Sequence, residues 1–199
     1  MPRDYLDYSQ LSMVDSLACG ERCALRLRVL NEPKNVFVSG RMQMLVLSAE
    51  DETGQIQVVW YNQPYRKSLL RKGCKYIFCG QVDNNRINRL INPIVCSELP
   101  GILPIYPLTK GLTQGRIRAA VKSAADAYLE ELNESLPNSI IEKYELMDLR
   151  QAIYALHFPQ TFGKLEVSRK RLAFEDLFAY FLAVNAFKEK KKSQKGISF

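Results

Sequence analysis

Three large aromatic side chains lie close together after a strand-like segment: Trp60, Tyr61 and Tyr65. The residues that follow are rich in cations. Residues 61–91 contain seven Lys or Arg and a single acid, Asp83. Flat rings stack on unpaired nucleic-acid bases, and Lys and Arg bind phosphates. This spacing therefore predicts a surface that follows a nucleic-acid strand. The seven cations are Arg66, Lys67, Arg71, Lys72, Lys75, Arg86 and Arg89.

The composition is that of a folded protein with a local positive field. The chain has 199 residues, 47% of them hydrophobic, and a formal net charge of +7. This length suits one domain with an appendage or two small domains. The sequence lacks an apolar run of the roughly 18 residues that a membrane span needs, and its first residues lack the apolar region of a signal peptide. We therefore expect an intracellular protein.

The residues that usually carry catalysis or bind metals are sparse. The five cysteines do not form paired CxxC motifs, so we expect reduced thiols and no zinc site. The single histidine, His157, precedes Phe158-Pro159 at a predicted helix end, where a capping or packing role is expected. No P-loop or dinucleotide-binding fingerprint occurs in the sequence. These observations argue against an independent enzyme.

Hydrophobic alternation predicts a small barrel in the first half of the chain. Five short segments have strand character, and a short helix closed by Gly73 lies between the third and the fourth. This is the element order of an OB-fold barrel. The predicted strands are residues 22–30, 42–47, 55–60, 75–82 and 86–91, and the predicted helix is residues 65–72.

A proline-rich connector and a helical region follow the predicted barrel. Three prolines within residues 99–107 keep the chain extended, and from Thr113, a plausible N-cap, the period changes to 3.6 residues. Further helices are expected near residue 140, from Asp148 to Pro159, and from about Ser168 to residue 192. The fold class is therefore mixed β + α, a five-stranded barrel, a connector and a small all-α segment. The expected divisions are a lead-in at residues 1–20, the barrel domain at 21–98, the connector at 99–113 and the helical region at 114–199.

The last predicted helix is apolar on most sides, so it needs partners on most sides. Two interpretations remain open. Part of this helix packs against something outside this chain, or it is the central helix of a small bundle. The apolar residues are Leu172, Phe174, Leu177, Phe178, Tyr180, Phe181, Leu182, Val184 and Phe187.

Several short segments, taken in order, resemble the N-terminal part of RecG, the bacterial ATP-dependent DNA helicase that remodels stalled forks and Holliday junctions. Together they extend over nearly the whole chain, and the Pro-x-Tyr-Pro-x-x-x-Gly-Leu segment is quite specific. The matching segments are Pro2-Arg3-Asp4-Tyr5-Leu6-Asp7, Asp51-Glu52-Thr53-Gly54, Trp60-Tyr61-Asn62-Gln63-Pro64-Tyr65, Asn92-Pro93, residues 104–112, Leu156-His157-Phe158-Pro159 and residues 171–177.

The resemblance implies that the barrel and the motor domains have different roles. In this family the barrel is a wedge domain at the branch point, while two RecA-like motor domains downstream use ATP and Mg²⁺ to pull the duplex apart. The sequence ends before any motor, so we expect a truncated piece that needs no cofactor and does not hydrolyse ATP by itself. The helical region would then pack on the absent motor. The resemblance also implies a bacterial cytoplasmic, nucleoid-associated monomer that binds forks and Holliday junctions in DNA repair and recombination.

The family's base-stacking pair, two aromatics four residues apart after the third strand, falls on Tyr61 and Tyr65. Strand alternation places Trp60 and Tyr61 on opposite faces, and we expect Trp60 to be the buried one. Arg66, Lys67, Arg86 and Arg89 are the predicted phosphate contacts, joined by Lys34 and Arg41 from the predicted loop around residues 31–40.

Two other functions are compatible with the sequence. One is an OB-fold protein that binds single-stranded DNA or tRNA with little regard to sequence. The other is a protein-assembly module whose helical region binds a protein partner and whose positive charge is incidental.

Overall fold

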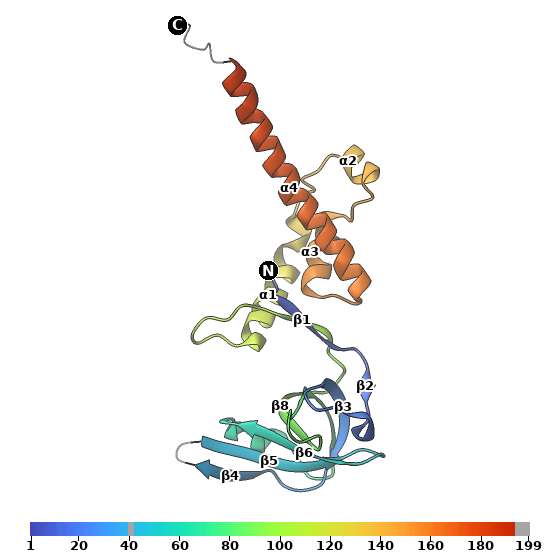
Figure 1. Ribbon diagram of the computed structural model, residues 1–199, viewed down its shortest axis with the longest axis vertical. Helices are drawn as coiled ribbons and strands as arrows, with labels where there is room; N and C mark the ends of the chain where they lie inside the picture. Colours follow the sequence, from blue (N-terminus) through green and yellow to red (C-terminus); the bar gives the residue numbers. More distant parts are fainter. Residues whose placement is uncertain (40–41, 194–199) are drawn as a thin grey trace. The chain divides into compact units, whose positions relative to one another are not determined.

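The computed structural model describes residues 1–39 and 42–193. The chain divides into two compact units, one formed by Tyr5–Leu103 and the other by Met1–Asp4 together with Pro104–Phe199. Figure 1 shows the strands of the first unit and the helices of the second.

Five strands of the first unit close into a barrel. The order is β3-β7-β8-β6-β5, and an additional pairing of β3 with β5 closes the circle. β6 and β8 run parallel, whereas the other four pairs are antiparallel. With the strands numbered along the chain, this is the connectivity of an OB fold, so the predicted mixed β + α class is confirmed. The bounds are β3 (Arg22–Val29), β5 (Met42–Glu50), β6 (Gln55–Tyr61), β7 (Lys75–Val82) and β8 (Arg89–Cys96).

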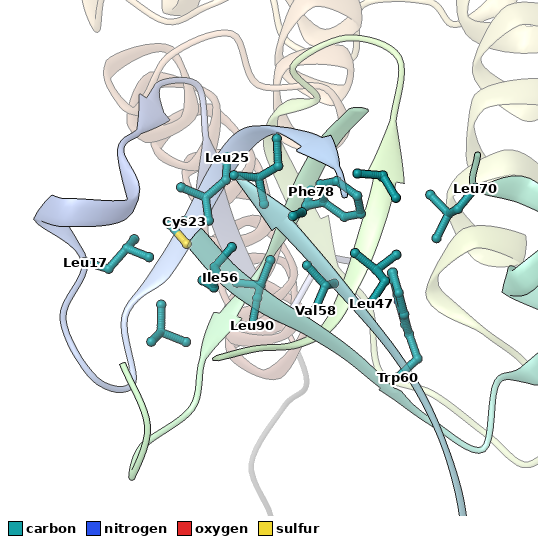
Figure 2. Packing of buried hydrophobic residues seen from close by; sticks show 14 of the residues in the cluster. Leu17, Cys23, Leu25, Leu47, Ile56, Val58, Trp60, Leu70, Phe78 and Leu90 are labelled. Atoms are coloured by element: carbon teal, nitrogen blue, oxygen red, sulfur yellow. The ribbon is translucent and has the colours of Figure 1, made fainter. Parts of the chain in front are cut away.

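Alternating apolar residues of the five strands fill the barrel. In β3, Leu25 and Leu27 are fully buried while Arg26 and Arg28 between and after them are exposed, as the sequence alternation predicts. Figure 2 shows side chains from several strands meeting in this interior, with Phe78 near its centre and Trp60 beside Leu47. Burial of this cluster removes apolar surface from water and stabilises the barrel.

The remaining strands of this unit were not predicted. β4 replaces most of the predicted loop, since its residues pair antiparallel with β5 from Lys34↔Val46 onward. The consecutive Val36 and Phe37 have strand propensity, but Asn31, Pro33 and Gly40 nearby are turn residues and favour a loop. β9 lies within the predicted proline connector and pairs with β1. The bounds are β1 (Asp4–Tyr8), β2 (Leu11–Ser12), β4 (Lys34–Ser39) and β9 (Gly101–Ile105).

Local boundaries also differ from the prediction at two places. β8 begins at Arg89 rather than residue 86, because residues 83–88 form the turn, in which Asp83 Oδ1 accepts a hydrogen bond from the Asn85 amide. The short helix after β6 is a 3₁₀ helix, η2 (Pro64–Leu69), and a second 3₁₀ turn, η1 (Val14–Ser16), precedes β3.

The second unit is helical. Thr113 accepts a hydrogen bond from the Arg116 amide and Asp148 accepts one from the Gln151 amide, so both side chains cap helices as N-caps do. The last helix begins at Phe162, not near residue 168, and the Thr161 hydroxyl accepts a hydrogen bond from the Lys164 amide at its start. The elements are α1 (Gln114–Tyr128), η3 (Leu129–Glu131), α2 (Asn138–Lys143), α3 (Leu149–His157) and α4 (Phe162–Ser193).

α4 is partly packed and partly exposed. The hydroxyl of Ser168 donates a hydrogen bond to the Ala152 carbonyl of α3 at 2.6 Å, and Arg171 is fully buried. Farther along, several apolar residues of α4 are more than half exposed, so α4 is not the central helix of a bundle formed by the described residues. These residues are Leu177, Tyr180, Phe181, Leu182 and Phe187. Among residues 1–39 and 42–193, no helix combines the length and the apolar character that a bilayer span requires.

Candidate nucleic-acid interface

The end of β6 places two neighbouring aromatic residues on opposite faces of the barrel wall. Trp60 is fully buried, and its Nε1 donates a hydrogen bond to the Pro93 carbonyl at 2.7 Å. The prediction that Trp60 is the buried ring is confirmed. Tyr61 lies opposite Met44, which lies opposite Val36, so these three residues share the outer face.

Two asparagines with positive φ anchor the turn that follows Tyr61. Asn62 (φ 54°) donates its amide to the Gln43 carbonyl at 2.9 Å, and its Oδ1 accepts a hydrogen bond from the Gln43 amide at 3.3 Å. Asn92 (φ 44°) accepts a hydrogen bond on its Oδ1 from the Tyr61 amide at 2.9 Å. Asn tolerates the left-handed region better than most residues. The backbone on both sides of Tyr61 is therefore tied to β5 and β8.

Tyr65 presents its ring to solvent from η2, with 64% of the residue exposed. Gln63 Oε1 accepts hydrogen bonds from the Arg66 Nε at 2.6 Å and from the Tyr65 hydroxyl at 3.2 Å. The Arg66 guanidinium carbon lies 5.8 Å from the ring centroid of Trp60 and 5.8 Å from that of Tyr65. A cation at this distance from an aromatic face is attracted by the ring quadrupole. Arg66 thus bridges the buried and the exposed ring.

Two further predicted phosphate contacts lie near the tyrosines. Lys67 is exposed on η2, and Lys34 is exposed on β4 opposite Val46, on the same outer face as Tyr61. The predicted contact Arg41 lies outside the described residues.

Arg86 and Arg89 are not brought together with the tyrosines. Arg89 lies opposite Gln57, four residues before Tyr61 along β6, which corresponds to about 13 Å of strand. Its Nε donates a hydrogen bond to Gln57 at 3.1 Å, and its Nη1 lies 3.9 Å from an Asp83 carboxylate oxygen. Arg86 is exposed in the adjoining turn. The sequence placed both residues in one basic window, but the parallel register of β8 on β6 separates them from the aromatic end.

Sequence reasoning overlooked the polar residues that position the rings. Asn62 and Gln63 lie between the aromatics, and an Asn after a strand is a turn signal that could have drawn attention to them. Asn92 lies 31 residues after Tyr61 and reaches its amide only because β8 pairs with β6. The local sequence gives no signal for this contact. Within the described part of the chain, no group of three or more His, Cys, Asp or Glu side chains could hold a metal ion.

Comparison with known proteins places this geometry in a family. The family model described as the RecG wedge domain matches residues 1–127. The ATP-dependent DNA helicase RecG of Thermotoga maritima is 30% identical over 205 residues, which include 98% of this chain and 26% of that protein. The corresponding protein of Synechocystis sp. is 31% identical over 98% of this chain and 26% of its own length.

A solved structure agrees with this assignment. The structure of RecG bound to a three-way DNA junction superposes with a TM-score of 0.80 at 28% identity, over 96% of this chain and 27% of that one. This chain spans about a quarter of the length of the RecG proteins that it matches. By the extent of the family match and the similarity of the fold, the chain belongs to the RecG wedge domain family.

Proposed function

We propose that this chain is the branched-DNA-binding wedge region of a RecG-like ATP-dependent DNA helicase. The observation that carries the proposal is the pair Tyr61 and Tyr65, on the outer face of β6 and on η2, with the Arg66 cation beside the exposed ring. A relative has been solved with a three-way DNA junction, which supports a branched substrate. Such a protein would serve replication-fork reversal, Holliday-junction processing, DNA repair and recombination.

The chemistry of the two rings suits a reader of branch points. Stacking of a base on an aromatic ring contributes about 1–3 kcal/mol and does not depend on sequence. At a branch point bases leave the duplex stack, so their faces become available to Tyr61 and Tyr65. Lys34, Lys67 and Arg66 would bind the phosphates next to these bases, with Arg86 and Arg89 meeting the DNA only farther along the barrel.

The energy for strand separation would come from outside this chain. We infer that ATP hydrolysis belongs to motor domains that occupy part of the remaining three quarters of the RecG relatives, and that this region acts without a cofactor. The exposed apolar residues of α4 suit packing against such a motor. The proposed setting is the bacterial cytoplasm and its nucleoid, with the protein acting as a monomer.

The proposal is tested by the double variant Tyr61→Ala with Tyr65→Ala. Competition binding would compare a three-way junction, a linear duplex and a single strand at several salt concentrations. We expect junction affinity to fall at least about tenfold and the preference over duplex to disappear, because two stacking contacts are lost. Tyr128→Ala with Tyr180→Ala is the matched control, since both tyrosines are exposed on helices.

Two outcomes would reject the proposal. Equal junction binding by the double variant and the parent would remove the role of the rings. A single strand that competes as well as the junction would indicate a general single-strand binder instead.

A further inference from the structure

An exposed aromatic residue lies at the same end of the barrel as the half-buried Tyr61 and the exposed Tyr65. Phe37 of β4 is 70% exposed, and its neighbour Val36 is 42% exposed. Isolated exposed apolar residues are common, but a large ring with this exposure on a strand next to a candidate interface is unusual. Figure 1 shows β4 beside β5 at the side of the barrel to which β6 also contributes.

Backbone pairing connects Phe37 to the aromatic turn. Phe37 lies opposite Gln43 of β5, and Gln43 exchanges two hydrogen bonds with Asn62, which follows Tyr61 directly. Phe37 is therefore two strand spacings, or about 10 Å, from the turn that carries Tyr61 and Tyr65. Two rings that enclose one base would be about 7 Å apart, at van der Waals contact on both of its faces. Phe37 and Tyr61 are too far apart to share a base.

The charge around Phe37 favours a polyanion over an apolar protein surface. Residues 33–49 and 55–70, which include β4, β6 and η2 and most of β5, contain no Asp or Glu and four Lys or Arg. Lys67 is exposed on η2, and Lys34 is exposed on the same strand as Phe37 but on its other face. An unpaired DNA strand offers both the bases that a ring needs and the phosphates that these cations attract.

We propose that Phe37 is a third stacking ring, which binds an unpaired base different from those on Tyr61 and Tyr65 and so guides one strand across β5 onto β4. By strand alternation, Phe37 faces the side of β5 on which Leu45 and Trp60 lie, and Arg66 links that side to Tyr65; Val36 and Tyr61 face the other side. This inference rests on the proposed function, because it extends the path of the same DNA. In this proposal, an unpaired DNA strand that leaves the branch point lies along β4.

A fluorescence scan with the full chain and a three-way junction tests this path. 2-Aminopurine, whose emission falls when it stacks, is placed in turn at each unpaired position next to the branch. We expect Phe37→Ala to restore emission at one position and Tyr61→Ala to restore it at another. Phe37→Ala should also weaken junction binding about fivefold to a hundredfold, while Phe37→Tyr stays close to the parent.

The matched control is Phe187→Ala, because Phe187 is similarly exposed, at 75%, on α4. If the parent does not prefer junctions over duplex, the proposed function fails. If junction binding depends on Tyr61 and Tyr65 but Phe37→Ala changes neither affinity nor emission, only the third ring is rejected. Concentration-dependent dimerisation that Phe37→Ala abolishes would instead assign this patch to a second copy of the chain.

Discussion

The indole nitrogen of Trp60 and the carbonyl oxygen of Pro93 form a buried hydrogen bond at 2.7 Å between two parallel strands. This contact fixes the end of β6 against β8. Since Tyr61 follows Trp60 and must face the other way, the buried ring and its hydrogen bond determine that Tyr61 faces outward. The interior of the barrel and its proposed binding face are thus coupled through adjacent residues.

Trp60→Phe should destabilise the barrel. The variant loses the indole donor, leaves a cavity, and removes a bond to the Pro93 carbonyl, so we expect the free energy of unfolding to fall by about 2–4 kcal/mol. Urea unfolding followed by tyrosine emission and by near-ultraviolet circular dichroism would measure the loss. Unchanged stability would mean that the hydrogen bond and the ring packing contribute little.

Gln63 is expected to position Tyr65 and Arg66 without touching the DNA. Gln63→Leu removes the acceptor for both side chains, so junction affinity should fall about threefold to tenfold through greater freedom of the ring, with little change in stability. The measurement is a double-mutant cycle. In a Tyr65→Ala background, Gln63→Leu should have a much smaller effect, and an equal effect would contradict the positioning role.

In the helical unit, replacing the carboxylate partner Glu134 should lower stability more than replacing the buried cation Arg171. Arg171 is fully buried and pairs with Glu134 and Glu175, whose side chains are 23% and 27% exposed. Its Nε has no hydrogen-bond partner among the described residues. Glu134→Ala leaves this charge with one partner and also removes the acceptor for the Leu136 and Leu149 amides, at an expected cost of about 3–5 kcal/mol.

Arg171→Met should cost less than Glu134→Ala, because a methionine fills similar volume and leaves only carboxylates that reach solvent. Helical circular dichroism at 222 nm reports mainly the second unit, whereas fluorescence of the only tryptophan, Trp60, reports the barrel. Both variants should lower the midpoint of the first signal. A larger loss in Arg171→Met would contradict this order.

Acid should destabilise the helical unit through its single histidine. His157 Nδ1 lies 2.8 Å from the Tyr106 hydroxyl, and burial lowers the pKa of His157 below its ordinary value of 6.5. The unfolded chain therefore binds a proton as the pH falls below about 6.5, while the folded chain resists protonation until its lower pKa is reached. Stability should fall as the pH decreases through this window and then level off.

The urea midpoint at pH 7.5, 6.5, 5.5 and 5.0 measures this effect, and His157→Gln is the comparison. The variant should have a flatter profile across the window. Glu134 contributes only at lower pH, because hydrogen bonds from the Leu136 and Leu149 amides and the Arg171 charge outweigh its partial burial and hold its pKa below 4.5. Parallel profiles for parent and variant would exclude His157 as the cause.

Much of the barrel followed from local patterns, whereas the strands that were missed depend on non-local pairing. The alternation in β3 and the caps at Thr113 and Asp148 depend on neighbours in sequence, and the structure agrees with them. β4 and β9 became strands only through pairing with β5 and β1, which no window around Val36 or Leu103 could reveal.

In the candidate site, too, some positions follow from the local sequence and others depend on strand pairing. Opposite faces for Trp60 and Tyr61 follow from the period of a strand, so the sequence was sufficient there. The separation of Arg89 from Tyr61 depends on the parallel register that places Arg89 opposite Gln57. Charge counted along the chain therefore overstated how many cations surround the rings.

The parallel contact between β6 and β8 also affects how fast the chain acquires its structure. Residues 32 positions apart, such as Val58 and Leu90, must meet before the barrel closes, whereas the turns of α4 form from neighbours. Closing such long loops costs chain entropy before the contacts can repay it, so topologies of this kind fold slowly. During refolding, helix should therefore develop well before tryptophan emission reaches its final value.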